Sequence, residues 1–461
     1  MVVAGAENLK ISQMDTEAAF TNGVLERETN HDTLQPLYME QDRYFQEDPD
    51  NRPRIHWVCE LLKALYGTKQ GARLWRELVH DHMQSEHMIP SKIMDCVYFG
   101  MRVEAPYDAA REHLRGIRSV TVVTDDFAIS HSEDSVGQRN YDAFVTRFLA
   151  KYAGTDMGAI EWYCSLQIRR AKTGVYSYNH AQYIDGMLHK QRITEIPGQD
   201  SPFSPHTMDR LNKYSRTDKE ACLGDIVDIT EYRSIVGALQ YPAHHSTPAA
   251  TATAGILAQY MSEGHVRTEH MQAARHLAGY LKQHKHAEMV MEPGNMKVTS
   301  GADAGYASCI RTRRSRTGLW VKVGGATVLW KSYMQNGVAK CPAESEVRAS
   351  SDAAKEVKCV QMHMDEYGYL QDEPTPVECD CDPAISTING NAPMSALRYL
   401  DVDARFAQEA RQAGIVKMVK VPGDDNTADV LTKASKDLTH QQVQLYTQRL
   451  MGATTAAAAG V

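Results

Sequence analysis

The stretch SVTVVTDDFAIS, residues 119–130, places two adjacent acids, Asp125 and Asp126, in the middle of a strand-like run. β-Branched and apolar residues flank the pair, and a buried carboxylate without a partner costs several kcal/mol. The pattern predicts a tight β-hairpin that presents both acids at its turn. Two carboxylates about 4 Å apart repel by roughly 4 kcal/mol at an effective dielectric near 20. The pair therefore favours either a solvated turn or a divalent-cation site with a third acid.

Composition limits the other possibilities. The 461 residues are 43% apolar and 23% charged, which predicts a globular protein of two to four domains. The nine cysteines include no C-x-x-C pair, and the spacing of Cys379 and Cys381 is poor for a zinc site, so we expect a reducing compartment. A net charge of −8 argues mildly against nucleic-acid binding. A local basic cluster argues the other way: Arg311, Arg313, Arg314 and Arg316.

The chain shows no targeting pattern. Its first residues lack the basic-then-apolar order of a signal peptide. The uncharged run 234–262 contains His and Pro residues, so we expect no membrane span there. We therefore expect a protein that is not secreted, with a cytoplasmic or nuclear location and the oligomeric state left open.

Hydrophobic periodicity divides the chain into an N-terminal α+β part, a helical connector and a C-terminal α/β part. The Pro- and Ser-containing stretch 196–230 predicts a linker, and residues 230–284 have mainly helical spacing. Further along, the patterns predict a hairpin at 317–332, a helix at 345–368, a strand at 376–382 and a disordered Ala-rich tail at 453–460.

Several short motifs follow one another in a fixed order: QMDTEAAF (13–20), VCELLKALYGTKQGARLW (58–75), DCVYFG (95–100) and the Asp pair. This order resembles the reverse transcriptase of copia-type LTR retrotransposons. The resemblance implies that Asp15, Asp125 and Asp126 are the three metal-binding aspartates of a polymerase palm. They would bind two Mg²⁺ ions, with Mn²⁺ as an alternative.

The same resemblance assigns nucleotide and template contacts. Phe20 matches an aromatic residue that blocks the ribose 2′-hydroxyl, although an isolated aromatic is otherwise a core residue. Lys69, Gln70 and Arg73 match a segment that contacts the incoming nucleotide and the template. Outside the family they would be ordinary polar groups at the start of a helix. Only fourteen residues precede Asp15, where the family has a basic fingers region, so we expect polymerisation to be impaired.

A second series of acids lies in the C-terminal part: Asp303, Glu344, Asp380 and Asp429. Each alone would be a solvated acid. Together their motifs resemble the copia-type RNase H domain: ADAGYAS (302–308), PAESEV (342–347), CDCDPAI (379–385) and NTADVLTK (426–433). The resemblance implies that the four acids bind two cations and hydrolyse the RNA strand of a hybrid. The arginine cluster would grip phosphates, or would be a solvated basic loop.

The resemblance covers roughly residues 11–435 and implies an α+β and α/β architecture. It consists of a polymerase palm- and thumb-like domain at 1–225 with the fingers largely missing, a helical connection at 226–295, an RNase H-like mixed-sheet domain at 296–440, and a helix end and tail at 441–461. The implied partners are an RNA template, a DNA primer, an RNA–DNA hybrid and deoxynucleoside triphosphates. The alternatives are a nuclease without polymerase activity and a non-catalytic relic that only binds nucleic acid.

Overall fold

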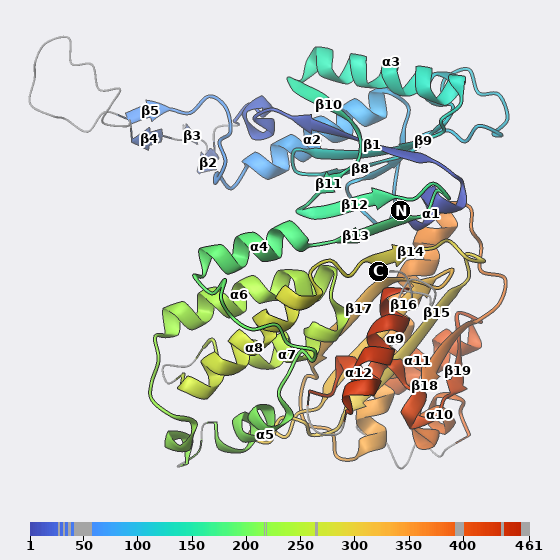
Figure 1. The fold of residues 1–461 in the computed structure, drawn as a ribbon. Coiled ribbons are helices and arrows are strands. Elements are labelled where there is room, and N and C mark those ends of the chain that lie inside the picture. Colours follow the sequence, from blue (N-terminus) through green and yellow to red (C-terminus); the bar gives the residue numbers. More distant parts are fainter. Residues whose placement is uncertain are drawn as a thin grey trace, which may run out of the picture. The chain divides into compact units, whose positions relative to one another are not determined.

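The computed structural model describes residues 1–25, 28–30, 33–35, 38–40, 58–215, 217, 219–262, 266–391, 401–434 and 438–452. The expected tail at 453–460 lies outside them. The chain forms two compact units. We call residues 9–164 the N-terminal unit, and residues 1–8 together with 165–461 the C-terminal unit (Figure 1). No helix in the described residues is long and apolar enough to cross a membrane.

The N-terminal unit is built on an antiparallel sheet with the strand order β10-β1-β9-β8-β7-β6. The strands are β1 (Lys10–Thr16), β6 (Ile89–Pro90), β7 (Val97–Phe99), β8 (Ile117–Val123), β9 (Asp126–His131) and β10 (Gly154–Ala159). The helices are α2 (Gly71–Ser85) and α3 (Ser135–Lys151), and short strands precede α2: β2 (Glu28–Asn30), β3 (Thr33–Gln35), β4 (Tyr38–Glu40) and β5 (Val58–Glu60). Strand β11 (Trp162–Tyr163) ends the unit.

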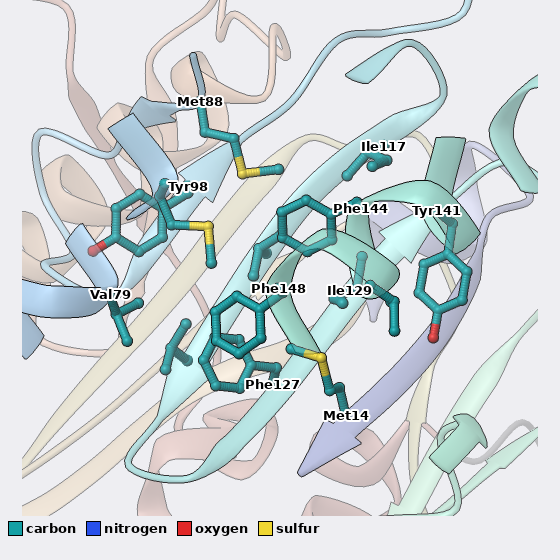
Figure 2. Close-up of a cluster of buried hydrophobic side chains, with 14 of the residues drawn as sticks. Met14, Val79, Met88, Tyr98, Ile117, Phe127, Ile129, Tyr141, Phe144 and Phe148 are labelled. Carbon is teal, nitrogen blue, oxygen red and sulfur yellow. The ribbon is translucent and has the colours of Figure 1, made fainter. Parts of the chain in front are cut away.

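Both helices of this unit pack on one apolar core. Figure 2 shows Phe144 and Phe148 of α3 beside Phe127 and Ile129 of β9, with Met14 of β1 close by. Met14 and Phe127 are register partners, so their side chains reach the same face of the sheet. This core fixes the β1–β9 pair, which carries the first set of acids.

The C-terminal unit contains a mixed five-stranded sheet with the order β17-β16-β15-β18-β19. Its strands are β15 (Val298–Gly305), β16 (Arg316–Val323), β17 (Ala326–Met334), β18 (Thr375–Cys379) and β19 (Val416–Lys420). The β15–β16–β17 pairs are antiparallel, whereas β15–β18 and β18–β19 are parallel. Four helices belong to this region: α9 (Pro342–Glu366), α10 (Asp382–Ile388), α11 (Asp401–Gln412) and α12 (His440–Met451).

The element predictions for this region are confirmed. The hairpin turns at Gly324 and Gly325, whose φ angles of +62° and +98° suit glycine. Helix α9 and strand β18 lie where they were predicted, although α9 begins three residues earlier and β18 ends at Cys379, before α10 begins at Asp382. The fold class, a mixture of α+β and α/β parts, is confirmed as well.

The remainder of the C-terminal unit is a small antiparallel sheet and a set of helices. The sheet contains β12 (Leu166–Arg170), β13 (Tyr176–Asn179) and β14 (Met289–Met291). The helices are α1 (Val2–Ala6), α4 (Ala181–Lys190), α5 (Pro205–Tyr214), α6 (Ile229–His245), α7 (Thr251–Ala258) and α8 (Thr268–His284). Helix α5 corrects the prediction of a linker over 196–230, because Met208 and Leu211 give this polar segment a buried face.

The core predicts a strong effect of one truncation. Phe148 is fully buried and its ring lies 4.8 Å from that of Phe127. We expect Phe148→Ala to lower the opening free energy of the β9 amides by about 3–5 kcal/mol, measured by hydrogen exchange. Tyr107→Ala, at a side chain that is 77% exposed, should change it by less than about 0.5 kcal/mol. Equal effects of the two variants would contradict the proposed core.

Candidate active sites

The first acid group lies where β1 meets β9. Asp15 and Asp126 are register partners in this antiparallel pair. Asp125 precedes β9 in a two-residue turn with Thr124, whose φ is +54°. The indole nitrogen of Trp75 donates to the Thr124 carbonyl over 2.7 Å and holds the turn against α2. The predicted hairpin with both acids at its turn is therefore confirmed.

The three aspartates interact electrostatically. All three are half-buried, and burial raises the pKa of Asp15, with a further rise from the charges of Asp126 and Asp125. The backbone also links them, because the Thr16 N–H donates to the Asp125 carbonyl over 3.0 Å. The Tyr66 hydroxyl donates to Asp125 Oδ2, and Gln13 Nε2 donates to Asp126 Oδ1 over 3.2 Å. Such mutual repulsion favours a cation between the carboxylates.

The predicted nucleotide-contacting residues lie on neighbouring elements. Phe20, in the short helix η1 (Ala19–Asn22), is half-buried with its ring 4.5 Å from that of Tyr66. A cavity of about 140 Å³ is lined by Phe20, Trp75 and Thr124, among others, so Phe20 lies on the cavity that adjoins the hairpin turn. Lys69 is exposed before α2, Gln70 is the α2 N-cap residue, and Arg73 forms an ion pair with Glu77 at 3.0 Å.

The second acid group lies at one edge of the C-terminal sheet. Asp303 is near the carboxyl end of β15, and Asp380 directly follows β18, its parallel neighbour. Asp429 lies in the short helix η8 (Thr427–Leu431), which packs on β15 and β16. Each of the three offers a carboxylate oxygen within 4.8 Å of the others. Parallel strands end at the same edge, so the topology brings these acids together.

Glu346, not Glu344, completes this group. Glu346 of α9 contributes an oxygen within 4.8 Å of Asp380, and its Oε1 accepts from the Ala304 N–H over 3.3 Å. Glu344 instead forms an ion pair with Arg348 at 2.7 Å and accepts from the Lys340 N–H over 2.7 Å. Residues two apart on a helix point about 200° apart, so only one of the two acids faces the sheet. The resemblance selected Glu344. Burial does not separate the two glutamates, because both are buried in α9, but their hydrogen-bond partners do.

Burial and mutual repulsion determine the protonation of the group. Burial raises the pKa of Asp303, Glu346 and Asp429, and neighbouring carboxylates raise each further. Lys433, which the sequence analysis did not single out, places Nζ 2.6 Å from Asp429 Oδ2. The charges of Asp303 and Asp429 raise the pKa of Lys433 against the effect of its own burial.

Two buried carboxylate oxygens of the second acid group accept no hydrogen bond from the part of the chain that is described. Within the described residues, Glu346 Oε2 and Asp429 Oδ1 are buried oxygens with no hydrogen-bond donor. Asp303 accepts from the Thr432 hydroxyl, and Asn426 Nδ2 donates to its Oδ1 over 3.4 Å. Buried oxygens without donors beside other carboxylates fit a divalent cation, which prefers oxygen ligands of this kind.

The arginine cluster does not form one exposed patch. Arg316 is 2% exposed within β16, where Nη1 donates to Ser332 Oγ over 3.2 Å. Arg314 Nε donates to the Gln335 carbonyl over 2.7 Å. The expectation of a compact exposed cluster is therefore wrong for Arg316, because β16 is buried on both faces at this end.

Comparison with known proteins gives a family match for the segment that contains the first acid group. The family model described as "Reverse transcriptase (RNA-dependent DNA polymerase)" matches residues 1–205. The first 205 residues are therefore similar to reverse transcriptases. The matched segment contains β1 and the β8–β9 hairpin, and so all three aspartates.

Relatives extend over nearly the whole chain. It is 26% identical over 433 residues to the "Retrovirus-related Pol polyprotein from transposon RE1" of Arabidopsis thaliana, and 25% identical over 434 residues to that from transposon TNT 1-94 of Nicotiana tabacum. Each match covers 94% of this chain but only 27% and 30% of the polyproteins. The chain is thus related to copia-type Pol polyproteins and spans under a third of their length.

Solved structures also match. A foamy viral protease-reverse transcriptase in complex with RNA/DNA hybrid aligns at 12% identity with a TM-score of 0.48, covering 93% of this chain and 46% of that one. RNase H1 from Halobacterium salinarum aligns at 16% identity with a TM-score of 0.24, covering 30% of this chain and 97% of that one.

The second acid group predicts a stability that depends on pH. A raised folded-state pKa means that the folded protein holds the proton more tightly, so stability falls as pH rises above the ordinary Glu value of 4.5. In EDTA we expect Glu346→Gln to stabilise the protein at pH 8 by at least about 1.4 kcal/mol, the equivalent of one pKa unit. The gain should vanish near pH 4.5. Urea unfolding of both proteins between pH 4.5 and pH 8 measures the difference in unfolding free energy. A gain in stability that does not depend on pH would contradict the argument.

Proposed function

We propose that the chain is an RNA-directed DNA polymerase with an attached RNase H, the two activities residing in the two acid groups. The observation that carries the proposal is the convergence of Asp303, Glu346, Asp380 and Asp429 at one sheet edge, with two buried oxygens left without donors. The match of residues 1–205 to the reverse transcriptase family model supports the polymerase half.

For hydrolysis, the four acids would hold two Mg²⁺ ions, because an all-carboxylate set suits hard cations; Mn²⁺ would also fit. When bound, such ions lower the pKa of a water and stabilise charge on the departing oxygen. The chain itself orients the ligands. The Thr432 hydroxyl and the Asn426 amide donate to Asp303, and Lys433 holds Asp429. The substrate would be the RNA strand of an RNA–DNA hybrid, distinguished by its 2′-hydroxyls.

For polymerisation, Asp15, Asp125 and Asp126 would hold the ions that bind a deoxynucleoside triphosphate at the end of a DNA primer. Phe20, beside the cavity at the hairpin turn, would exclude a ribose 2′-hydroxyl. Lys69, Gln70 and Arg73, around the start of α2, would contact the incoming nucleotide and the RNA template. Arg73 would have to leave its exposed ion pair with Glu77, which costs little.

A nuclease without polymerase activity is the second candidate. The carboxylate oxygens of Asp303, Asp380 and Asp429 all lie within 4.8 Å of one another, whereas Asp15, Asp125 and Asp126 do not form such a group. The Tyr66 hydroxyl occupies one oxygen of Asp125, whereas its other oxygen is buried without a donor among the described residues. The closer spacing of the second group is therefore what favours a pre-organised hydrolytic site over a pre-organised polymerase site.

The two glutamates of α9 provide a matched test of hydrolysis. With Mg²⁺ and a labelled RNA–DNA hybrid, Glu346→Gln should lower the cleavage rate by at least about 100-fold, because it removes a ligand where charge develops. Glu344→Gln should keep most of the activity, since the partners of Glu344 are Arg348 and the Lys340 N–H and not the other acids. Circular dichroism confirms that both variants fold. Equal loss in both, or cleavage that survives Glu346→Gln, would refute the assignment.

Primer extension tests the other half. On an RNA template with a DNA primer and deoxynucleotides, we expect extension by the wild type and a loss of at least about 100-fold in Asp126→Asn. Asp95→Asn, at an exposed acid paired with Arg76 in the same unit, is the control that should extend normally. A wild type that cleaves hybrids without extending primers would select the nuclease alone.

A further inference from the structure

Cys379, the last residue of β18, lies among the acids of the second group but has no part in the proposed hydrolysis. Its side chain is fully buried. Its Sγ lies within 4.8 Å of a carboxylate oxygen of Glu346 and of one of Asp380. A thiol therefore shares two carboxylates with the proposed hydrolytic site.

A second observation points to a ligand at this position. Glu346 is only 7% exposed, and its Oε2 has no hydrogen-bond donor among the described residues. Buried oxygens of this kind are rare without a bound group. The sulfur also acts as an acceptor, since the Cys381 N–H donates to it over 3.4 Å. Asp380 is half-buried and connects the three ligand atoms to solvent.

The atom types select the cation. Magnesium binds oxygen and avoids sulfur, whereas zinc and its relatives bind thiolate together with carboxylate. Zinc holds sulfur at about 2.3 Å and carboxylate oxygen at about 2.0–2.2 Å, so its ligand atoms lie at most about 4.5 Å apart. Ligand atoms within 4.8 Å of one another need only small side-chain adjustments to reach that geometry.

We propose that Glu346, Cys379 and Asp380 form a binding site for a thiophilic divalent cation of the zinc class. Binding displaces the Cys379 thiol proton to solvent and forms the metal–sulfur bond without any redox change. Because Glu346 and Asp380 are shared, the bound cation excludes Mg²⁺ from these carboxylates and so inhibits hydrolysis. The inhibition rests on the proposed function, whereas the binding does not.

Cadmium titration of the full chain tests the binding, because Cd²⁺–thiolate bonds absorb in the ultraviolet. We expect a saturable band in the wild type that is lost in Cys379→Ser and kept in Cys381→Ser, the matched control. Glu346→Gln should weaken Cd²⁺ binding by at least about tenfold and keep the band at saturation. Excess Mg²⁺ should also weaken Cd²⁺ binding, since the two cations share the carboxylates of Asp380 and Glu346. Identical Cd²⁺ spectra in the wild type and Cys379→Ser would overturn the proposal.

The two proposals fail in different ways. Zn²⁺ should inhibit Mg²⁺-dependent cleavage of a hybrid at least about tenfold more strongly in the wild type than in Cys379→Ser. A Cd²⁺ band at Cys379 in a protein that never cleaves would overturn the proposed function and leave the cation site standing. Cleavage by a protein that shows no Cd²⁺ band would overturn the cation site and leave the proposed function standing. Circular dichroism and the Glu346→Gln titration keep the test decisive if Cys379→Ser misfolds.

Discussion

Repulsion between converging carboxylates is the constraint on which the C-terminal unit depends. The parallel β15–β18 pair brings Asp303 and Asp380 to the same edge, and α9 and η8 add Glu346 and Asp429 from either side. Nothing in the packing of the sheet requires acids there. Burial and mutual repulsion raise the pKa of three of them, so keeping these acids together in ionised form opposes folding. An arrangement that opposes stability in this way is typical of a functional site.

The N-terminal unit also brings acids together, but with a different strand topology. There the antiparallel register of β1 and β9, fixed by the core around Met14 and Phe127, places Asp15 opposite Asp126. The left-handed conformation of Thr124 tightens the turn that presents Asp125. Its acids are less buried than those of the C-terminal unit, so they repel through water as well as through protein. This difference accounts for the looser arrangement of the first group.

Much of both groups could be predicted from the sequence, because strand-like runs that end in acids are local patterns. Asp15, Asp125, Asp126, Asp303 and Asp380 lie at or beside strand ends or in a short turn, where such patterns are clear. Asp429 lies in the short helix η8 and was proposed from the family resemblance. The choice between Glu344 and Glu346 could not be made from the motif, since it depends on which face of α9 meets β15. The burial of Arg316 and the contact of Lys433 were missed for a related reason. Their environments are created by other segments of the chain, with Ser332 in the neighbouring strand β17 and Asp303 in β15 among them.

Lys433 has one more consequence. Its ammonium group is attached to the chain and stands 2.6 Å from Asp429, so part of the charge of the site is balanced from within the protein. Such a tethered counter-ion lowers the repulsion that a bound cation would otherwise have to cancel in the folded chain. Metal ions bound at the site would then exchange with the solution. Their occupancy would follow the metal concentration and would not be set during folding.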